Sequence, residues 1–213
     1  MKVLIFDTET SGLLPKSVVS LTQIPYIVQL CYLVYDTDSH VIETHNDYIR
    51  IPASVDLTES QKIHEIPRSR LDEVGIDMLS ALIKFGQHYR TCDFVVAHNI
   101  EFDIKMVNYE CVRNDISPII HKYDPTKVFY CTMAKGVKIC KIEKLTKTGK
   151  TYFKWPKLIE LHEHLFNQTP YKLHDAYHDN LVCLRCFNSM QFGNDLLADN
   201  DRFRREFNVI LQN

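Results

Sequence analysis

Residues 2–10 read Lys-Val-Leu-Ile-Phe-Asp-Thr-Glu-Thr, an apolar run that ends in two carboxylates, Asp7 and Glu9. The run predicts a buried strand that delivers Asp7 to its C-terminal end. A carboxylate in that position is costly unless it is paired or binds a metal ion. In α/β sheets, functional sites gather at the carboxyl ends of strands. Two acids two positions apart are a weak signal alone, and a polar loop that follows a strand is the alternative interpretation.

A second apolar run, residues 94–97, leads into Asn99 and Asp103. We expect a second buried strand here, followed by a helix over about residues 100–112. Asn99 is then placed to cap that helix, which is the purely structural interpretation. If the two strands are parallel neighbours, Asp103 in the first turns of the helix faces the same end of the sheet as Asp7.

A third polar segment, His-Asp-Ala-Tyr-His-Asp at residues 174–179, opens another predicted helix. His174 and Asp179 are five positions apart, which a regular helix separates by about 140° of rotation. His174 is therefore expected in or before the first turn, where a loop position lets it swing back over the site. His178 is the rival histidine, and Asp175 is the rival acid because it shares a helix face with Asp179. A polar helix start without a catalytic role is the alternative.

The rest of the chain predicts strands and helices in alternation, which favours an α/β layering. Apolar segments on both sides of the turn-forming residues 36–39 are expected to form an antiparallel hairpin, over residues 27–35 and 41–49. Residues 128–132 are expected to form a further strand, and helical spacing marks residues 57–64, 76–89, 157–166, 174–191 and 194–211. We see no repeat and no change in composition, and we expect one domain over residues 1–213.

Composition excludes several classes of protein. The 213 residues are 45% apolar and 24% charged, which excludes disordered, collagenous and low-complexity chains. A net charge of -2 excludes a uniformly basic protein held on nucleic acid by bulk charge. Seven cysteines and no signal-like segment predict a soluble, intracellular protein in a reducing compartment. Residues 17–35 form an uncharged run of 19, but its proline, glutamine and hydroxyl groups favour a loop and a buried strand over a membrane span.

Taken together, Asp7-x-Glu9, Asn99-x-x-Phe102-Asp103 and His174-x-x-x-x-Asp179 resemble the DEDDh branch of the DnaQ-like 3'-to-5' exonucleases. The resemblance spans nearly the whole chain and includes the residues that follow the first acid. It implies a ribonuclease H-like α/β fold, with a mixed five-stranded central sheet and helices on both faces. It also implies two divalent ions, Mg²⁺ or Mn²⁺, at the acidic cluster.

The resemblance assigns roles to the motif residues. Asp7 is expected to bridge the two ions, Glu9 and Asp179 to complete the site, and Asp103 to hold the cluster directly or through water. His174 is the expected general base, since the unperturbed pKa of histidine, about 6.5, suits proton removal at neutral pH. His178 beside the last acid is the rival. We prefer His174 because a helical His178 projects about 100° away from Asp179.

The resemblance also implies substrate contacts. Leu13 and Phe102 are expected to separate the terminal base from its neighbour, with buried core as the alternative for Phe102. Asn99 and the backbone around Thr8 are expected to bind the terminal sugar or phosphate. His98 is expected to be structural rather than catalytic. The full expected substrate-binding set is Thr8, Thr10, Leu13, His98, Asn99, Phe102, Lys138 and Lys141.

The lysines in that set belong to a basic stretch. Lysine recurs at every third position from 135 to 150 and again at 154 and 157, with Glu143 as the only acid among them. A basic patch near an acidic site suits a nuclease, because the phosphate backbone has to be attracted and its charge neutralised. Tyr152, Phe153 and Trp155 lie beside it and are candidates for stacking on bases. The alternative is a flexible, solvated loop.

We therefore expect a metal-dependent 3'-to-5' exonuclease that acts on single-stranded nucleic acid with a free 3' end and releases nucleoside 5'-monophosphates. DNA is slightly favoured as substrate, with RNA as the alternative, and a polymerase or another replication or repair protein is a candidate partner. The rival hypothesis is a non-catalytic nucleic-acid or polymerase-binding module on the same fold. Four carboxylates that repel phosphates argue against it. A nuclease or phosphatase that needs no 3' end is a third hypothesis.

Overall fold

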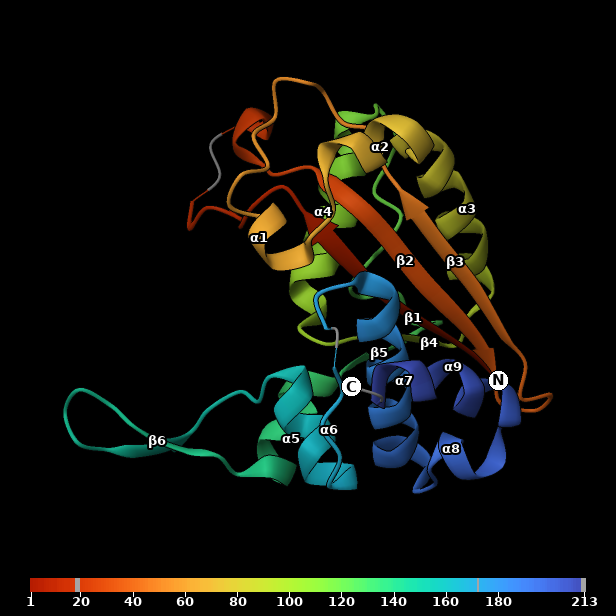
Figure 1. Cartoon of the computed structure of the whole chain (residues 1–213), viewed down its shortest axis with the longest axis vertical. Coiled ribbons are helices and arrows are strands. Elements are labelled where there is room, and N and C mark those ends of the chain that lie inside the picture. The colour runs from red at the N-terminus through yellow and green to blue at the C-terminus, as the bar shows by residue number, and fades with distance from the viewer. Residues whose placement is uncertain (18–19, 172, 212–213) are drawn as a thin grey trace.

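The computed structural model describes residues 1–17, 20–171 and 173–211. Within these residues, a five-stranded sheet has the order β3-β2-β1-β4-β5 (Figure 1). The central strand β1 pairs antiparallel with β2 and parallel with β4, and β4 pairs parallel with β5. The expected mixed sheet is confirmed, as is the parallel pairing of the two strands that carry the first two motifs. The strands are β1 (Lys2–Thr10), β2 (Ile27–Asp36), β3 (Ile42–Tyr48), β4 (Phe94–Ala97) and β5 (Val128–Cys131).

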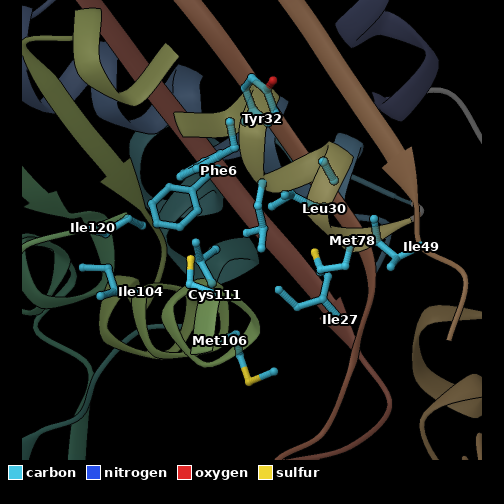
Figure 2. Packing of buried hydrophobic residues seen from close by; sticks show 14 of the residues in the cluster. Phe6, Ile27, Leu30, Tyr32, Ile49, Met78, Ile104, Met106, Cys111 and Ile120 are labelled. Atoms are coloured by element: carbon cyan, nitrogen blue, oxygen red, sulfur yellow. The ribbon is translucent and has the colours of Figure 1, made fainter. Parts of the chain in front are cut away.

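Side chains of β1 alternate between two hydrophobic cores, one on each face of the sheet. Leu4 and Phe6 point into the first core, which is closed by α3 (Met78–Thr91) and α4 (Ile100–Arg113). Figure 2 shows Phe6 among other side chains of this core. Val3 and Ile5 point into the second core. That core is closed by α6 (Leu158–Phe166), α7 (Ala176–Phe192), α8 (Leu196–Asp199) and α9 (Asp201–Leu211). Because strand side chains alternate with a period of two, the register of β1 decides which face each acid reaches.

The predicted hairpin of β2 and β3 is confirmed. The carboxylate of Asp36 accepts hydrogen bonds from the backbone N–H groups of Asp38 and Ser39, at 2.9 and 3.2 Å, and this stabilises the turn. The strand β2 is buried along all but its last residue, whereas the edge strand β3 is mostly exposed or half-buried. The uncharged run noted in the sequence therefore continues into a core strand. Among the described residues, no helix is long and apolar enough to cross a membrane.

Several predicted helices differ from those observed. The segment predicted helical over residues 57–64 is helical only in α1 (Gln61–His64), and α2 (Arg68–Val74) follows it. The helix predicted over residues 194–211 is interrupted at Asn200, so that α8 and α9 are separate. The reason is that Asn200 Oδ1 accepts a hydrogen bond from the N–H of Phe203, while its Nδ2 donates to the carbonyl of His40. The side chain thus caps α9 and ties it to the β2–β3 turn. A short 3₁₀ helix, η1 (Leu21–Gln23), precedes β2.

The lysine-rich stretch is structured rather than a featureless loop. It consists of α5 (Thr132–Cys140) and an antiparallel hairpin of β6 (Glu143–Leu145) and β7 (Thr151–Phe153). The hairpin projects from the body of the molecule (Figure 1). Its turn is closed by a hydrogen bond from the N–H of Thr146 to the carbonyl of Lys150, with Gly149 at a φ of 80°.

Candidate active site

Three carboxylates meet at the C-terminal end of β1. Asp7 and Glu9 are two positions apart and continue the face on which Val3 and Ile5 point into the second core. Asp179 lies in the first turn of α7, the helix that packs on this face. Carboxylate oxygens of these three acids lie within 4.8 Å of one another. The sheet register and the docking of α7 therefore bring the first and third motifs together.

Burial and mutual repulsion make this cluster unfavourable without a cation. Burial, followed by the nearby charge of Asp175, raises the pKa of Asp7 to about 7. Burial, followed by Asp7 and Asp175, raises the pKa of Glu9 to about 8. The pKa of Asp179 is also raised, first by burial and then by Asp7 and Glu9, and its Oδ1 is buried without a hydrogen-bond partner. Hard oxygen ligands with unsatisfied charge are what Mg²⁺ and Mn²⁺ bind, so these residues fit the divalent ions that the motifs imply.

Asp103 lies beside this trio but is held from the other face of the sheet. It is 2% exposed on α4, and its Oδ1 accepts hydrogen bonds from Thr8 Oγ1 at 2.8 Å and from the Thr8 N–H at 3.1 Å. Burial and then the charge of Asp7 raise its pKa. The carboxylate oxygens of Asp103 do not belong to the group of Asp7, Glu9 and Asp179 oxygens that lie within 4.8 Å of one another. Thr8, expected to offer its backbone to the substrate, uses both its N–H and its hydroxyl to position Asp103.

His174 precedes α7, as the spacing predicts. Its φ is 73°, the helix begins two residues later, and its backbone N–H donates to Asp179 Oδ2 at 3.4 Å. The side chain is exposed and lines a cavity together with Asp7 and Asp179. The rival acid Asp175 is the N-cap of α7, where its carboxylate accepts hydrogen bonds from the N–H groups of Tyr177 and His178.

Asn180, next to the last acid of the third motif, has a structural role. It is fully buried, and its Nδ2 donates to the carbonyl of Cys31 on β2 at 2.9 Å. Gln29 on the same strand accepts a hydrogen bond from the N–H of Ala176 at 3.2 Å. These two bonds fix the start of α7 against the sheet, so they determine how closely Asp179 approaches β1.

The cavity beside the cluster has a volume of about 1060 Å³. Asn99 and the 86% exposed Leu13 line it, as expected of substrate contacts. Phe102 does not line it but packs, partly buried, against the first core, so the core interpretation of this residue is favoured. Met133 and Tyr171 line the cavity and were not foreseen, because neither lies in a recognisable motif.

His98 and Thr10 are engaged within the protein. The His98 Nδ1 is 3.0 Å from Thr132 Oγ1 and its Nε2 is 3.1 Å from the carbonyl of Pro156. Burial lowers the pKa of His98 to about 4, so the ring is neutral and its hydrogen bonds link β4 to the segment before α6. His98 also lines the cavity, and its expected contact with the substrate stays a prediction. Thr10 Oγ1 donates to the carbonyl of Gly12 at 2.7 Å.

Asn99 occupies the N-cap position of α4, as the structural interpretation places it, but its side chain makes no capping hydrogen bond. Its backbone is left-handed, with a φ of 73°, whereas a capping residue normally has extended backbone that brings its side chain to the free N–H groups. The amide side chain lines the cavity instead.

Lys138 and Lys141 lie at the end of α5, exposed at the base of the projecting hairpin. The segment that follows the hairpin leads directly into the cavity, which Trp155 and Lys157 line. Lys154 forms an ion pair with Glu160, with 2.5 Å between Lys154 Nζ and Glu160 Oε1. The basic stretch is thus continuous along the chain with the wall of the cavity.

Comparison with known proteins agrees with this geometry. The model of the RNase T family, described as an exonuclease family, matches residues 4–187. Two Exonuclease I structures share the fold: that of E. coli in complex with a dT13 oligonucleotide (13% identity, TM-score 0.62) and that of Methylocaldum szegediense (15% identity, TM-score 0.66). A full-length 3'-exonuclease also matches, with 17% identity and a TM-score of 0.64. The ribonuclease H-like fold implied by the motifs is confirmed.

These matches cover 90%, 96% and 91% of this chain, in the same order. They cover only 42%, 44% and 62% of the solved chains. The chain therefore spans less than half the length of the two Exonuclease I proteins. No curated protein sequence matches the chain.

The raised carboxyl pKa values predict a stability that falls as pH rises when divalent ions are removed by EDTA. Asp7 and Glu9 titrate near 7 and 8 in the folded chain, against about 4 when unfolded, so the folded state binds more protons. The stability that this contributes is lost as pH rises through the folded values. Between about pH 6.5 and about pH 8.5, we expect the free energy of unfolding to fall by on the order of 1 kcal/mol for each of these two groups.

Urea unfolding of the chain and of Asp7→Asn, both in EDTA, measures this difference. Buried histidines and cysteines titrate in both proteins and cancel. The Asp7→Asn variant should lose less stability over the same pH range, and excess Mn²⁺ should remove most of the pH dependence of the unsubstituted chain. Equal pH dependence in the two proteins contradicts the electrostatic description of the cluster.

Proposed function

Since this chain belongs to the RNase T exonuclease family, with residues 4–187 matched, we propose that it removes nucleotides from the 3' end of single-stranded nucleic acid. The observation that carries the proposal is the meeting of Asp7, Glu9 and Asp179 in one cluster, of which Asp7 and Asp179 line a large cavity together with His174. Residues 1–213 would act as one exonuclease domain.

The acidic residues are the proposed holders of two divalent ions, Mg²⁺ or Mn²⁺. Asp7, Glu9 and Asp179 offer converging oxygens, and Asp103 supports the cluster while held by Thr8. When bound, such ions neutralise negative charge on the phosphoryl group and lower the pKa of a water molecule. The protein contributes carboxylate ligands at fixed positions. Because these side chains are buried, they are oriented before the substrate binds.

His174 is the proposed general base. Its place on a left-handed turn, outside α7, leaves the ring exposed at the cavity that Asp7 and Asp179 line. It would accept a proton from the attacking water. The new bond would join the water oxygen to the terminal phosphorus while the bond from phosphorus to the 3' oxygen of the preceding nucleotide breaks. That oxygen would take up a proton and become the new 3' hydroxyl, and a nucleoside 5'-monophosphate would leave.

The cavity would receive the terminal nucleotide. Its volume of about 1060 Å³ is at the upper end for small-molecule sites. The exposed side chains of Leu13 and Trp155 line it. Asn99 offers an amide for a sugar or phosphate group. Stacking on exposed aromatic and apolar side chains binds bases of any sequence, which suits an exonuclease that degrades whole strands.

DNA is the favoured substrate and RNA the alternative. Support for DNA comes from the dT13 oligonucleotide in the E. coli Exonuclease I structure that shares this fold. A replication or repair protein such as a polymerase is the proposed second partner, supported only by the fact that one solved structure with this fold is described as SSB/Exonuclease I. The rival binding module is disfavoured by the unpaired carboxylates, which repel phosphate.

Digestion of 5'-labelled oligonucleotides tests the activity. We expect ladders that shorten from the 3' end with Mg²⁺ or Mn²⁺, no cleavage in EDTA, and no attack on circular single-stranded DNA. Asp7→Asn and Asp179→Asn should each lower the rate at least about 100-fold, because even outer-shell changes at metal sites cost 10–100-fold. DNA and RNA of the same sequence rank the two substrates. Binding without cleavage under every metal condition supports the non-catalytic module instead.

Single substitutions of the two histidines test the general base. His174→Ala should lower kcat by about 10² to 10⁴, the usual contribution of general-base catalysis. His178→Ala, which removes the same kind of side chain four residues away, should leave kcat nearly unchanged. The reverse result assigns the proton transfer to His178.

Charge reversal tests the basic stretch. The triple variant Lys138→Glu, Lys141→Glu, Lys144→Glu should weaken binding of single-stranded DNA. It should also reduce the slope of log affinity against log salt by about 0.7 for each phosphate that the variant no longer neutralises. The matched control is Lys2→Glu, Arg90→Glu, Arg205→Glu, three exposed cations outside this stretch. If both triple variants change the salt slope equally, the effect is one of net charge, and the stretch makes no specific interaction with the strand.

A further inference from the structure

A second group of metal-ligating side chains lies on the face of the sheet opposite the acidic cluster. Glu43 and His45 are two positions apart on the edge strand β3, and His88 lies on α3. Their ligand atoms are all within 4.8 Å of one another. His45 pairs across the sheet with Tyr32, which belongs to the first core, whereas Asp7 and Glu9 extend the face of the second core.

The two imidazole rings are held in place by aromatic contacts. The His45 ring stacks on that of Tyr32, with centroids 4.5 Å apart and planes inclined by 13°. The His88 ring lies 4.5 Å from that of His45 and 5.5 Å from that of Tyr32. Tyr32 itself is fully buried. Ordering these rings around an ion therefore costs little additional side-chain entropy.

One nitrogen of this group lacks a partner. The Nε2 atom of His45 is buried and makes no hydrogen bond, and the nearest carboxylate oxygen, Glu43 Oε2, is 4.0 Å away. That distance is too long for a hydrogen bond. A buried polar atom without a partner is unfavourable, and an ion placed between this nitrogen and the carboxylate would satisfy both.

We propose that Glu43, His45 and His88 form a zinc site that links the edge strand β3 to α3. Two imidazole nitrogens and one carboxylate oxygen are a known ligand set for Zn²⁺, with a fourth position left for water. Imidazole ligands favour Zn²⁺ over Mg²⁺, whereas the all-oxygen cluster on the other face has the opposite preference. The ion would also bind the otherwise exposed edge strand to the body of the protein.

Zinc binding is best measured in the full chain carrying Asp7→Asn and Asp179→Asn, which removes the acidic cluster as a competing site. After EDTA treatment and equilibrium dialysis against buffered Zn²⁺, we expect one zinc per chain by elemental mass spectrometry. We also expect a rise in Tm with Zn²⁺ but not with Mg²⁺. Adding His88→Gln or Glu43→Gln to this protein should weaken zinc binding by at least about 100-fold and abolish the Tm rise.

His164→Gln, on an exposed histidine of α6, is the matched control and should leave zinc binding unchanged. If His88→Gln alters the circular dichroism spectrum, Glu43→Gln decides, because the Glu43 side chain is 59% exposed and its loss leaves packing intact. The proposal is overturned if the doubly substituted protein binds no zinc, or if zinc bound there is unaffected by His88→Gln and Glu43→Gln, which would place it on other groups such as cysteines.

Discussion

The register of β1 is the constraint on which the rest of the structure depends. Its odd-numbered residues, from Val3 to Glu9, face α7, and its even-numbered residues, from Leu4 to Thr8, face α3 and α4. A slip of one residue would exchange the two sets, bury Asp7 in the wrong core and withdraw Thr8 from Asp103. Placing an unpaired carboxylate among the apolar side chains of the first core is costly, so such a slip is unfavourable and the register holds the acids at the second face.

The acidic cluster is maintained at the expense of stability. Burial and repulsion raise the pKa values of Asp7, Glu9, Asp103 and Asp179, and one oxygen of Asp179 has no hydrogen-bond partner. The protein offsets part of this cost locally, since Thr8 gives two hydrogen bonds to Asp103. Strain of this kind at a site is usual where it serves chemistry, and divalent ions would relieve the remainder.

The two faces of the sheet thus carry different kinds of ligand set. One face carries an all-oxygen cluster at the wall of a cavity, and the lysine-rich hairpin is continuous along the chain with that wall. The other face carries, at the edge strand, the imidazoles of His45 and His88 and the carboxylate of Glu43. Because hard cations prefer oxygen and borderline cations accept nitrogen, the two proposed sites would select different metal ions through their ligand chemistry.

The sequence by itself determined that Asp7 and Glu9 end a buried strand and that Asp103, His174 and Asp179 lie at or before the starts of helices. Local patterning is sufficient for this, because apolar runs and strand period depend on neighbouring residues. Their meeting at one end of the sheet was expected only if the first two motif strands are parallel neighbours, and the pairing of β1 with β4 is what the tertiary structure added. Only the tertiary structure decided that Thr8 holds Asp103, that Asn99 has a left-handed backbone, and that Phe102 joins the core. Those outcomes depend on how α4 packs against β1. The meeting of Glu43, His45 and His88 likewise depends on where α3 crosses the edge strand, a contact between distant segments that no local pattern encodes.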